Sequence, residues 1–124
     1  MAKIATHKDL RVFQTAFKAA MEIYRLSKLF PVEEKYSLTD QVRRSSRSVC
    51  ANLAEAFRKR RYPKNFVSKL SDCEAEAAET HVWLDFALAY DYVTIEEYEK
   101  LYKEYDMILG MLVRMIVEPE KWNL

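Results

Sequence analysis

The side chains best suited to chemistry in this sequence are the arginines and lysines that crowd into one short segment. Residues 41–64 contain eight Lys or Arg residues and one Glu, a local charge of +7 in a chain whose formal net charge is +1. A guanidinium group is a planar fork of N–H donors that suits phosphate and carboxylate equally well. The candidate ligand-binding residues are Arg43, Arg44, Arg47, Arg58, Arg60, Arg61 and Lys64.

A helix over residues 37–60 would place most of these arginines on one face. At about 100° per residue, Arg47 and Arg58 fall within about 60° of Arg43, and Arg44 falls about 100° away. The apolar residues of the segment fall on a separate side, namely Leu38, Val42, Val49, Leu53 and Phe57. A basic face beside a core face predicts binding to the phosphates of nucleic acid, with a steep dependence on salt.

An acidic segment provides the competing explanation for these arginines. Residues 72–106 contain eleven Asp or Glu residues against two Lys, a local charge of −9. Asp72, Glu76, Glu79 and Trp83 would share one side of a helix, and we predict them as oligomer-interface residues. The arginines would then pair with this side, within one bundle or across a subunit boundary. Both explanations stay open and could hold together.

Catalytic and metal-dependent chemistry finds little support in the sequence. A di-iron site in a helical bundle needs Glu-x-x-His, but the residue three before His81 is Ala78. Cys50 and Cys73 lack the histidine partner of a nucleophile and fit buried thiols. With Gly110 as the single glycine, a glycine-rich phosphate loop is excluded. We expect no catalytic residues, no metal, no cofactor and no enzymatic activity.

The composition and the spacing of apolar residues predict the elements that hold these side chains. A chain of 124 residues that is 50% hydrophobic and almost free of glycine predicts a single all-α domain. Prolines and capping residues delimit helices at about 9–29, 37–60, 63–91 and 95–117. The short connections between them predict an up-down-up-down antiparallel four-helix bundle. The predicted buried face of the first helix is Leu10, Phe13, Phe17, Ala20 and Tyr24.

Particular helix ends and the cellular location also follow from the sequence. Ser37 is expected to cap the second helix, Pro63 to open the third, and Thr94 with Glu97 to form a capping box. Pro119 should stop the fourth helix. The apolar stretches are too short for a membrane span, no signal-peptide pattern opens the chain, and the two cysteines suit a reducing compartment. We therefore expect a cytoplasmic protein.

Several motifs together resemble one bacterial family. They are Phe30-Pro31, Gln41-Val42-Arg43-Arg44-Ser45, Asn52-Leu53-Ala54-Glu55-Ala56, Trp83-Leu84 and Pro119-Glu120-Lys121-Trp122. Over nearly the whole chain the pattern is similar to the four-helix bundle proteins related to the protein encoded in 23S ribosomal RNA intervening sequences. The resemblance implies a homo-oligomer, typically a ring-like pentamer, with a basic surface. Some relatives are accessory proteins of diversity-generating retroelements, which bind nucleic acid and a reverse transcriptase.

One departure from the family pattern bears on the two explanations. Where the family usually has Gly-Ser in the third helix, this chain has Ala75-Glu76. The additional carboxylate favours pairing with the arginines. The sequence therefore supports two hypotheses. In the first, the protein is a non-enzymatic oligomer that binds RNA or DNA backbone through the second helix. In the second, it is a scaffold or adaptor oligomer that uses the same arginines between subunits.

Overall fold

Four long helices make up most of the computed structural model, which describes residues 3–123. They are α1 (Arg11–Ser27), α2 (Leu38–Arg58), α3 (Pro63–Ala89) and α4 (Ile95–Val117). Short 3₁₀ helices flank them at His7–Asp9, Val32–Glu34 and Pro119–Trp122. The described residues contain no strand, which confirms the all-α prediction, and every predicted helix end lies within two residues of the observed one.

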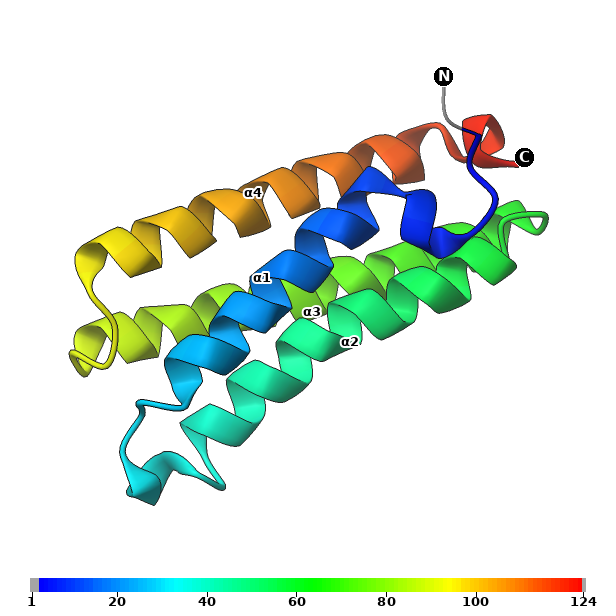
Figure 1. The fold of residues 1–124 in the computed structure, drawn as a ribbon. Coiled ribbons are helices and arrows are strands. Elements are labelled where there is room, and N and C mark those ends of the chain that lie inside the picture. The colour runs from blue at the N-terminus through cyan, green and yellow to red at the C-terminus, as the bar shows by residue number, and fades with distance from the viewer. Residues whose placement is uncertain (1–2, 124) are drawn as a thin grey trace.

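The helices form an antiparallel bundle in which each helix reverses the direction of the one before (Figure 1). The connections at residues 59–62 and 90–94 are too short for any other course. The described ends of the chain lie at the end of the bundle where α2 passes into α3 (Figure 1). Within residues 3–123 no helix is both long enough and apolar enough to cross a membrane.

The helix ends follow local rules that the sequence predicts with one exception. Thr94 and Glu97 form the expected capping box, and Pro63 is the first residue of α3. Ser37 occupies the cap position of α2, but its hydroxyl makes no capping bond. The Glu34 carboxylate instead accepts the N–H of Leu38 at 3.3 Å. Asp91 turns the chain between α3 and α4 with a φ of 62°, a left-handed conformation that Asp tolerates better than most residues.

The core combines the predicted apolar face of α2 with buried residues of α3 and α4. The five predicted apolar residues of α2 are all buried, and Phe66, Leu70 and Tyr105 have at most 1% of their surface exposed. Cys73 is also buried, as expected of a small thiol, whereas Cys50, expected to be buried as well, is only half-buried. Because the apolar residues of α2 pack into this core, the rotation of α2 about its own axis is fixed. The direction in which its arginines point is therefore fixed as well.

The prediction for the first helix is wrong for Phe17 and Tyr24, whereas Leu10 is buried and Phe13 packs half-buried against the core. The buried face consists of Val12, Ala16, Ala19, Ile23 and Leu26. Phe17 is 51% exposed and Tyr24 is 37% exposed. Both sets repeat at helical spacing, and the set with two alanines packs inward because small side chains let neighbouring helices approach closely. As a result, α1 presents aromatic side chains at the surface beside α2.

Candidate nucleic-acid interface

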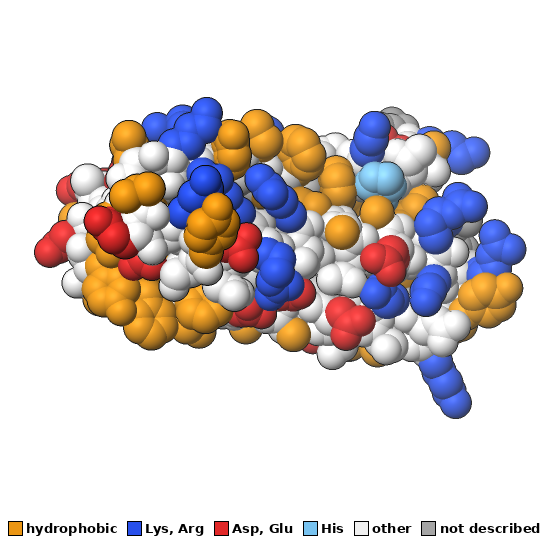
Figure 2. Space-filling model, turned by 90° about the horizontal axis from the view of Figure 1, so that it is seen from below, with side chains coloured by type: hydrophobic (Ala, Val, Ile, Leu, Met, Phe, Trp, Pro, Cys, Tyr) orange, Lys and Arg blue, Asp and Glu red, His pale blue; other side chains and the backbone are white. Residues whose placement is uncertain are grey.

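The end of α2 and the start of α3 carry a dense group of cations, which we call the basic turn: Arg58, Lys59, Arg60, Arg61 and Lys64. The helix ends at Arg58, two residues before the predicted end at about residue 60, and Arg61 lies in the turn. Arg58, Lys59, Arg61 and Lys64 are exposed, and none of them forms an ion pair with a described residue. Figure 2 shows a group of Lys and Arg side chains at this end of the molecule.

Arg60 differs from its neighbours because it helps to end the helix. Its Nη1 donates to the carbonyl oxygen of Phe57 at 2.8 Å, and its guanidinium carbon lies 3.9 Å from the centre of the Phe57 ring. A cation at the carboxyl end of a helix also interacts favourably with the helix dipole. This predicted ligand-binding residue therefore has a structural role in the basic turn.

A second basic feature lies near the start of α2, where a surface hollow of about 510 Å³ separates the helix from the preceding connection. We call it the arginine hollow. Its charged and aromatic lining consists of Lys35, Tyr36, Asp40, Arg43, Arg44 and Arg47. The predicted residues Arg43, Arg44 and Arg47 thus lie together, in the first half of α2, and the basic turn lies beyond the other end of this helix.

Arg43 and Arg47 are held against the exposed ring of Tyr24 on α1. The guanidinium carbon of Arg43 lies 4.6 Å from the ring centre, and that of Arg47 lies 5.9 Å from it. Arg43 also donates its Nε–H to the hydroxyl of Ser27 at 2.7 Å. An arginine oriented through its Nε keeps its two terminal amino groups for an oxyanion such as phosphate. The hollow is therefore bordered by oriented donors.

Arg44 points away from this pair toward α3. It donates to Glu79 at 2.8 Å and lies 3.4 Å from Glu76, within the same chain. These hydrogen bonds raise the pKa of Arg44 above its ordinary value. Among the predicted arginines, Arg44 is the one whose charge the acidic side of α3 offsets, as the pairing hypothesis expects within one bundle.

The other predicted interface residues are also engaged inside the chain. Asp72 lies 3.6 Å from the ammonium of Lys69, which also pairs with Glu55 at 3.1 Å. Trp83 donates its indole N–H to Glu79 at 3.2 Å and is half-buried. The pair between Lys69 and Glu55 joins α3 to α2, whereas the other two contacts lie within α3. The assignment of these residues to a subunit interface stays a prediction.

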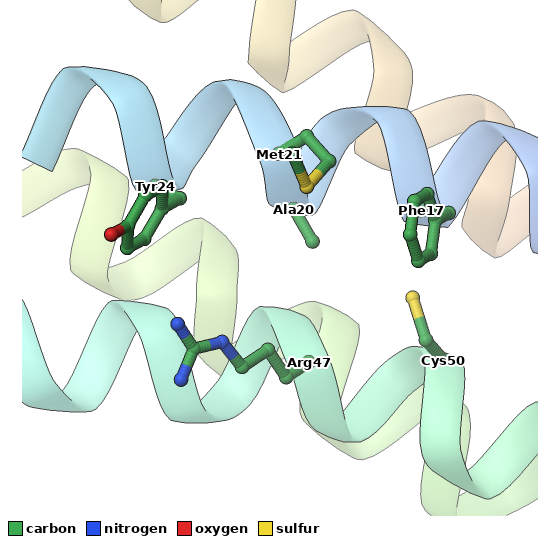
Figure 3. Close-up of a pocket in the computed structure, with 6 residues that line it drawn as sticks. All are labelled: Phe17, Ala20, Met21, Tyr24, Arg47 and Cys50. Atoms are coloured by element: carbon green, nitrogen blue, oxygen red, sulfur yellow. The ribbon is translucent and has the colours of Figure 1, made fainter.

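An apolar hollow of about 440 Å³ lies on the neighbouring surface between α1 and α2 (Figure 3). Phe17, Ala20, Met21 and Tyr24 face it from α1, and Arg47 and Cys50 face it from α2 (Figure 3). Figure 3 shows the Arg47 guanidinium extended toward Tyr24 and the Cys50 thiol opposite Phe17. The exposed aromatic face of α1 and the arginine face of α2 therefore border one another.

Cys50 and Cys73 are protonated thiols, and His81 packs against an aromatic ring. Burial raises the pKa of Cys50 to about 11 and that of Cys73 to about 12, which keeps both thiols protonated at neutral pH. The ring of His81 stacks on Tyr102 with 4.2 Å between centres. No three His, Cys, Asp or Glu side chains in residues 3–123 form a group that could hold a metal ion.

The structure adds surface residues that the sequence pattern did not single out. Lys35 and Tyr36 belong to the connection before α2, and Tyr36 is 85% exposed. Tyr62 is 56% exposed within the basic turn. Helical periodicity cannot identify them, because they lie outside the helices. The one available signal is their direct proximity in sequence to the predicted arginine segment.

The two basic features lie within reach of one nucleic-acid strand. Arg47 and Arg58 are separated by about 16 Å along the axis of α2, at about 1.5 Å per residue. Along the axis of a duplex each strand carries one phosphate per about 3.4 Å, so this separation corresponds to the rise of roughly five phosphates. Figure 2 shows Lys and Arg side chains distributed along this side of the molecule as well as at its end. The arrangement suits contact with an extended polyanion.

Comparison with known proteins gives a family and a structural relative. The family model described as "23S rRNA-intervening sequence protein" matches residues 8–114. A solved structure from Bacteroides thetaiotaomicron, described as a protein of unknown function from the S23 ribosomal protein family, is 30% identical. Its TM-score is 0.76 over 85% of this chain and 97% of that chain. No curated protein matches the chain. The match over residues 8–114 confirms the resemblance seen in the sequence, and the chain belongs to the 23S rRNA-intervening sequence protein family.

Proposed function

We propose that this protein is a non-enzymatic nucleic-acid-binding protein that contacts the phosphate backbone through α2 and the basic turn. The observation that carries the proposal is the set of four exposed cations, Arg58, Lys59, Arg61 and Lys64, which have no anionic partner among the described residues. Like charges gathered on a surface repel one another, and an anionic ligand relieves that repulsion. The oriented pair Arg43 and Arg47 extends the same surface toward the other end of α2.

The chemistry of the surface favours backbone contacts over base recognition. Arginine and lysine contacts to phosphate position a protein on nucleic acid without reporting its sequence. The protein is therefore expected to bind many sequences with similar affinity. Since the family description refers to 23S rRNA, a structured RNA is the first ligand to test.

A triple substitution in the basic turn tests the proposal. Replacing Arg58, Arg61 and Lys64 with Gln removes three charges from exposed positions and should leave the fold intact. We expect the Kd for a structured RNA, measured by fluorescence anisotropy at low salt, to rise about tenfold or more because several charge-assisted contacts are lost.

A matched variant on α4 controls for the change in total charge. Lys100, Lys103 and Arg114 are exposed on α4, and their replacement with Gln changes the net charge by the same amount. This control should bind RNA within about twofold of the wild type. Equal losses in both variants would mean that net charge alone drives binding and would contradict a site at the basic turn.

A second candidate function is supported by the apolar surface of α1. We infer that the protein also forms a homo-oligomeric scaffold, in which a second copy covers Phe17, Met21 and Tyr24. Phe17 and Met21 are more than half exposed, and they border the apolar hollow that Arg47 closes at one side. The acidic surface of α3 and α4 complements the basic charge of α2, so a head-to-tail contact between copies is electrostatically favourable.

Light scattering of a double variant tests the scaffold. Replacing Phe17 and Met21 with Glu places charge on the apolar surface without touching the core. We expect the wild type to have the mass of several copies, five by the resemblance, and the variant to shift toward the mass of one chain. An oligomeric mass that is unchanged by the double substitution would contradict the role of this surface.

A further inference from the structure

Tyr36 is the most exposed aromatic side chain in the part of the chain that the structure describes, at 85% of its surface. It lies at the border of the arginine hollow, in the connection between α1 and α2. The aromatic rings of the core pack against neighbours, but this ring leaves most of its surface to solvent. An exposed aromatic ring beside cations is the arrangement on which proteins stack an unpaired base.

The cationic groups around Tyr36 suit the phosphates that accompany a base in a nucleotide. The ammonium of Lys35 lies 5.3 Å from the centre of the Tyr36 ring. Farther along the hollow, Arg43 and Arg47 present guanidinium groups that are oriented by Tyr24. A base on Tyr36 would therefore have cations nearby for the phosphates on either side of it.

The size and the charge of the hollow set the kind of ligand. Its volume of about 510 Å³ and its open surface admit a nucleotide that remains part of a longer chain. Lys35, Arg43 and Arg47 outnumber the single carboxylate in the lining, Asp40, and Arg44 is already paired with Glu76 and Glu79. In a duplex the base faces are stacked on one another, so a duplex cannot present a base face to Tyr36.

We propose that the arginine hollow binds an unpaired nucleotide of single-stranded nucleic acid, with its base stacked on Tyr36 and its phosphates on Lys35, Arg43 and Arg47. This inference rests on the proposed function and adds a preference for single strands. The basic turn contacts backbone of either form, and the hollow distinguishes an unpaired base from a paired one.

The test compares two fluorescent probes, a 12-nucleotide oligouridylate and a 12-base-pair RNA duplex, by anisotropy at the same salt concentration. For Tyr36→Ala we expect the Kd for the single strand to rise about fivefold or more. A rise of about fivefold is the low end of the effect expected from the loss of one stacked base. The Kd for the duplex should change by less than about twofold. Tyr36→Trp, which restores a stacking surface, should bind the single strand within about twofold of the wild type.

Two controls separate the possible outcomes. Tyr90→Ala removes another exposed tyrosine, 52% exposed at the end of α3, and should leave both affinities unchanged. Circular dichroism checks that each variant is folded. If Tyr36→Ala binds the single strand as the wild type does, or weakens duplex binding equally, the stacking site is contradicted and the backbone site stands. If the wild type binds neither probe, the proposed function fails, and this inference fails with it.

Discussion

Arginines that lie close in sequence have different roles because helix geometry separates them. Arg43 and Arg47 lie against Tyr24, whereas Arg44 reaches Glu76 and Glu79 on α3. The sequence predicts a common basic face, and the offset of Arg44 by about 100° already indicates that it borders the neighbouring helix. Charge and periodicity also predict the acidic side of α3 as a partner, but they do not say which arginine reaches Glu76 and Glu79, because that depends on how α2 packs on α3.

Tyr98 joins α4 to α3 through a hydrogen bond whose contribution to stability depends on pH. Its hydroxyl donates to the carboxylate of Asp85. This hydrogen bond, followed by burial, raises the pKa of Tyr98 to about 12 from an ordinary value of 10.0. Above pH 10 the unfolded chain therefore releases this proton before the folded protein does. The contribution of Tyr98 to stability is complete below pH 10 and is lost as the pH rises toward 12.

Urea unfolding of the wild type and Tyr98→Phe at pH 9, 11 and 12 measures this contribution. The wild type should lose more unfolding free energy over this range than the variant, because the phenylalanine has no proton to release. Lysines and other tyrosines also titrate there, but they do so in both proteins. Parallel pH profiles for the two proteins would contradict the proposed contact between Tyr98 and Asp85.

At the scale of elements, the order and ends of the helices could be predicted because they depend on local chemistry. Pro63 and Thr94 act within a few residues of their own positions, and both have their predicted roles. The rotation of α1 could not be predicted in the same way. Two sets of apolar residues compete for the core, and only packing against the other helices selects the set that contains Ala16 and Ala19.

The candidate site was predictable in part for the same reason. Most of its cations belong to α2, the following turn and the start of α3, where composition alone identifies them. Tyr36 and Lys35 lie in a connection without a periodic pattern, and their position beside Arg43 depends on the fold. Tyr24 was assigned to the core from its spacing, yet it supports two arginines at the surface.

At the scale of the whole molecule, the distribution of charge matters more than its sum. The formal net charge is only +1, so the protein as a whole attracts a polyanion weakly. Residues 41–64 carry +7 and residues 72–106 carry −9, which gives the bundle a basic side and an acidic side. The proposed binding to nucleic acid therefore depends on local charge, and we expect it to depend on particular cations.

The salt dependence of RNA binding tests this central claim most directly. The measurement is the affinity of the wild type and of the triple Gln variant at Arg58, Arg61 and Lys64 for a structured RNA, over a series of salt concentrations. The slope of log affinity against log salt should be about −3 or steeper for the wild type. It should become shallower by about 2 to 3 in the variant, since each phosphate contact contributes about 0.7 to 0.9. A wild-type slope near zero, or the same slope in both proteins, would contradict phosphate binding at the basic turn.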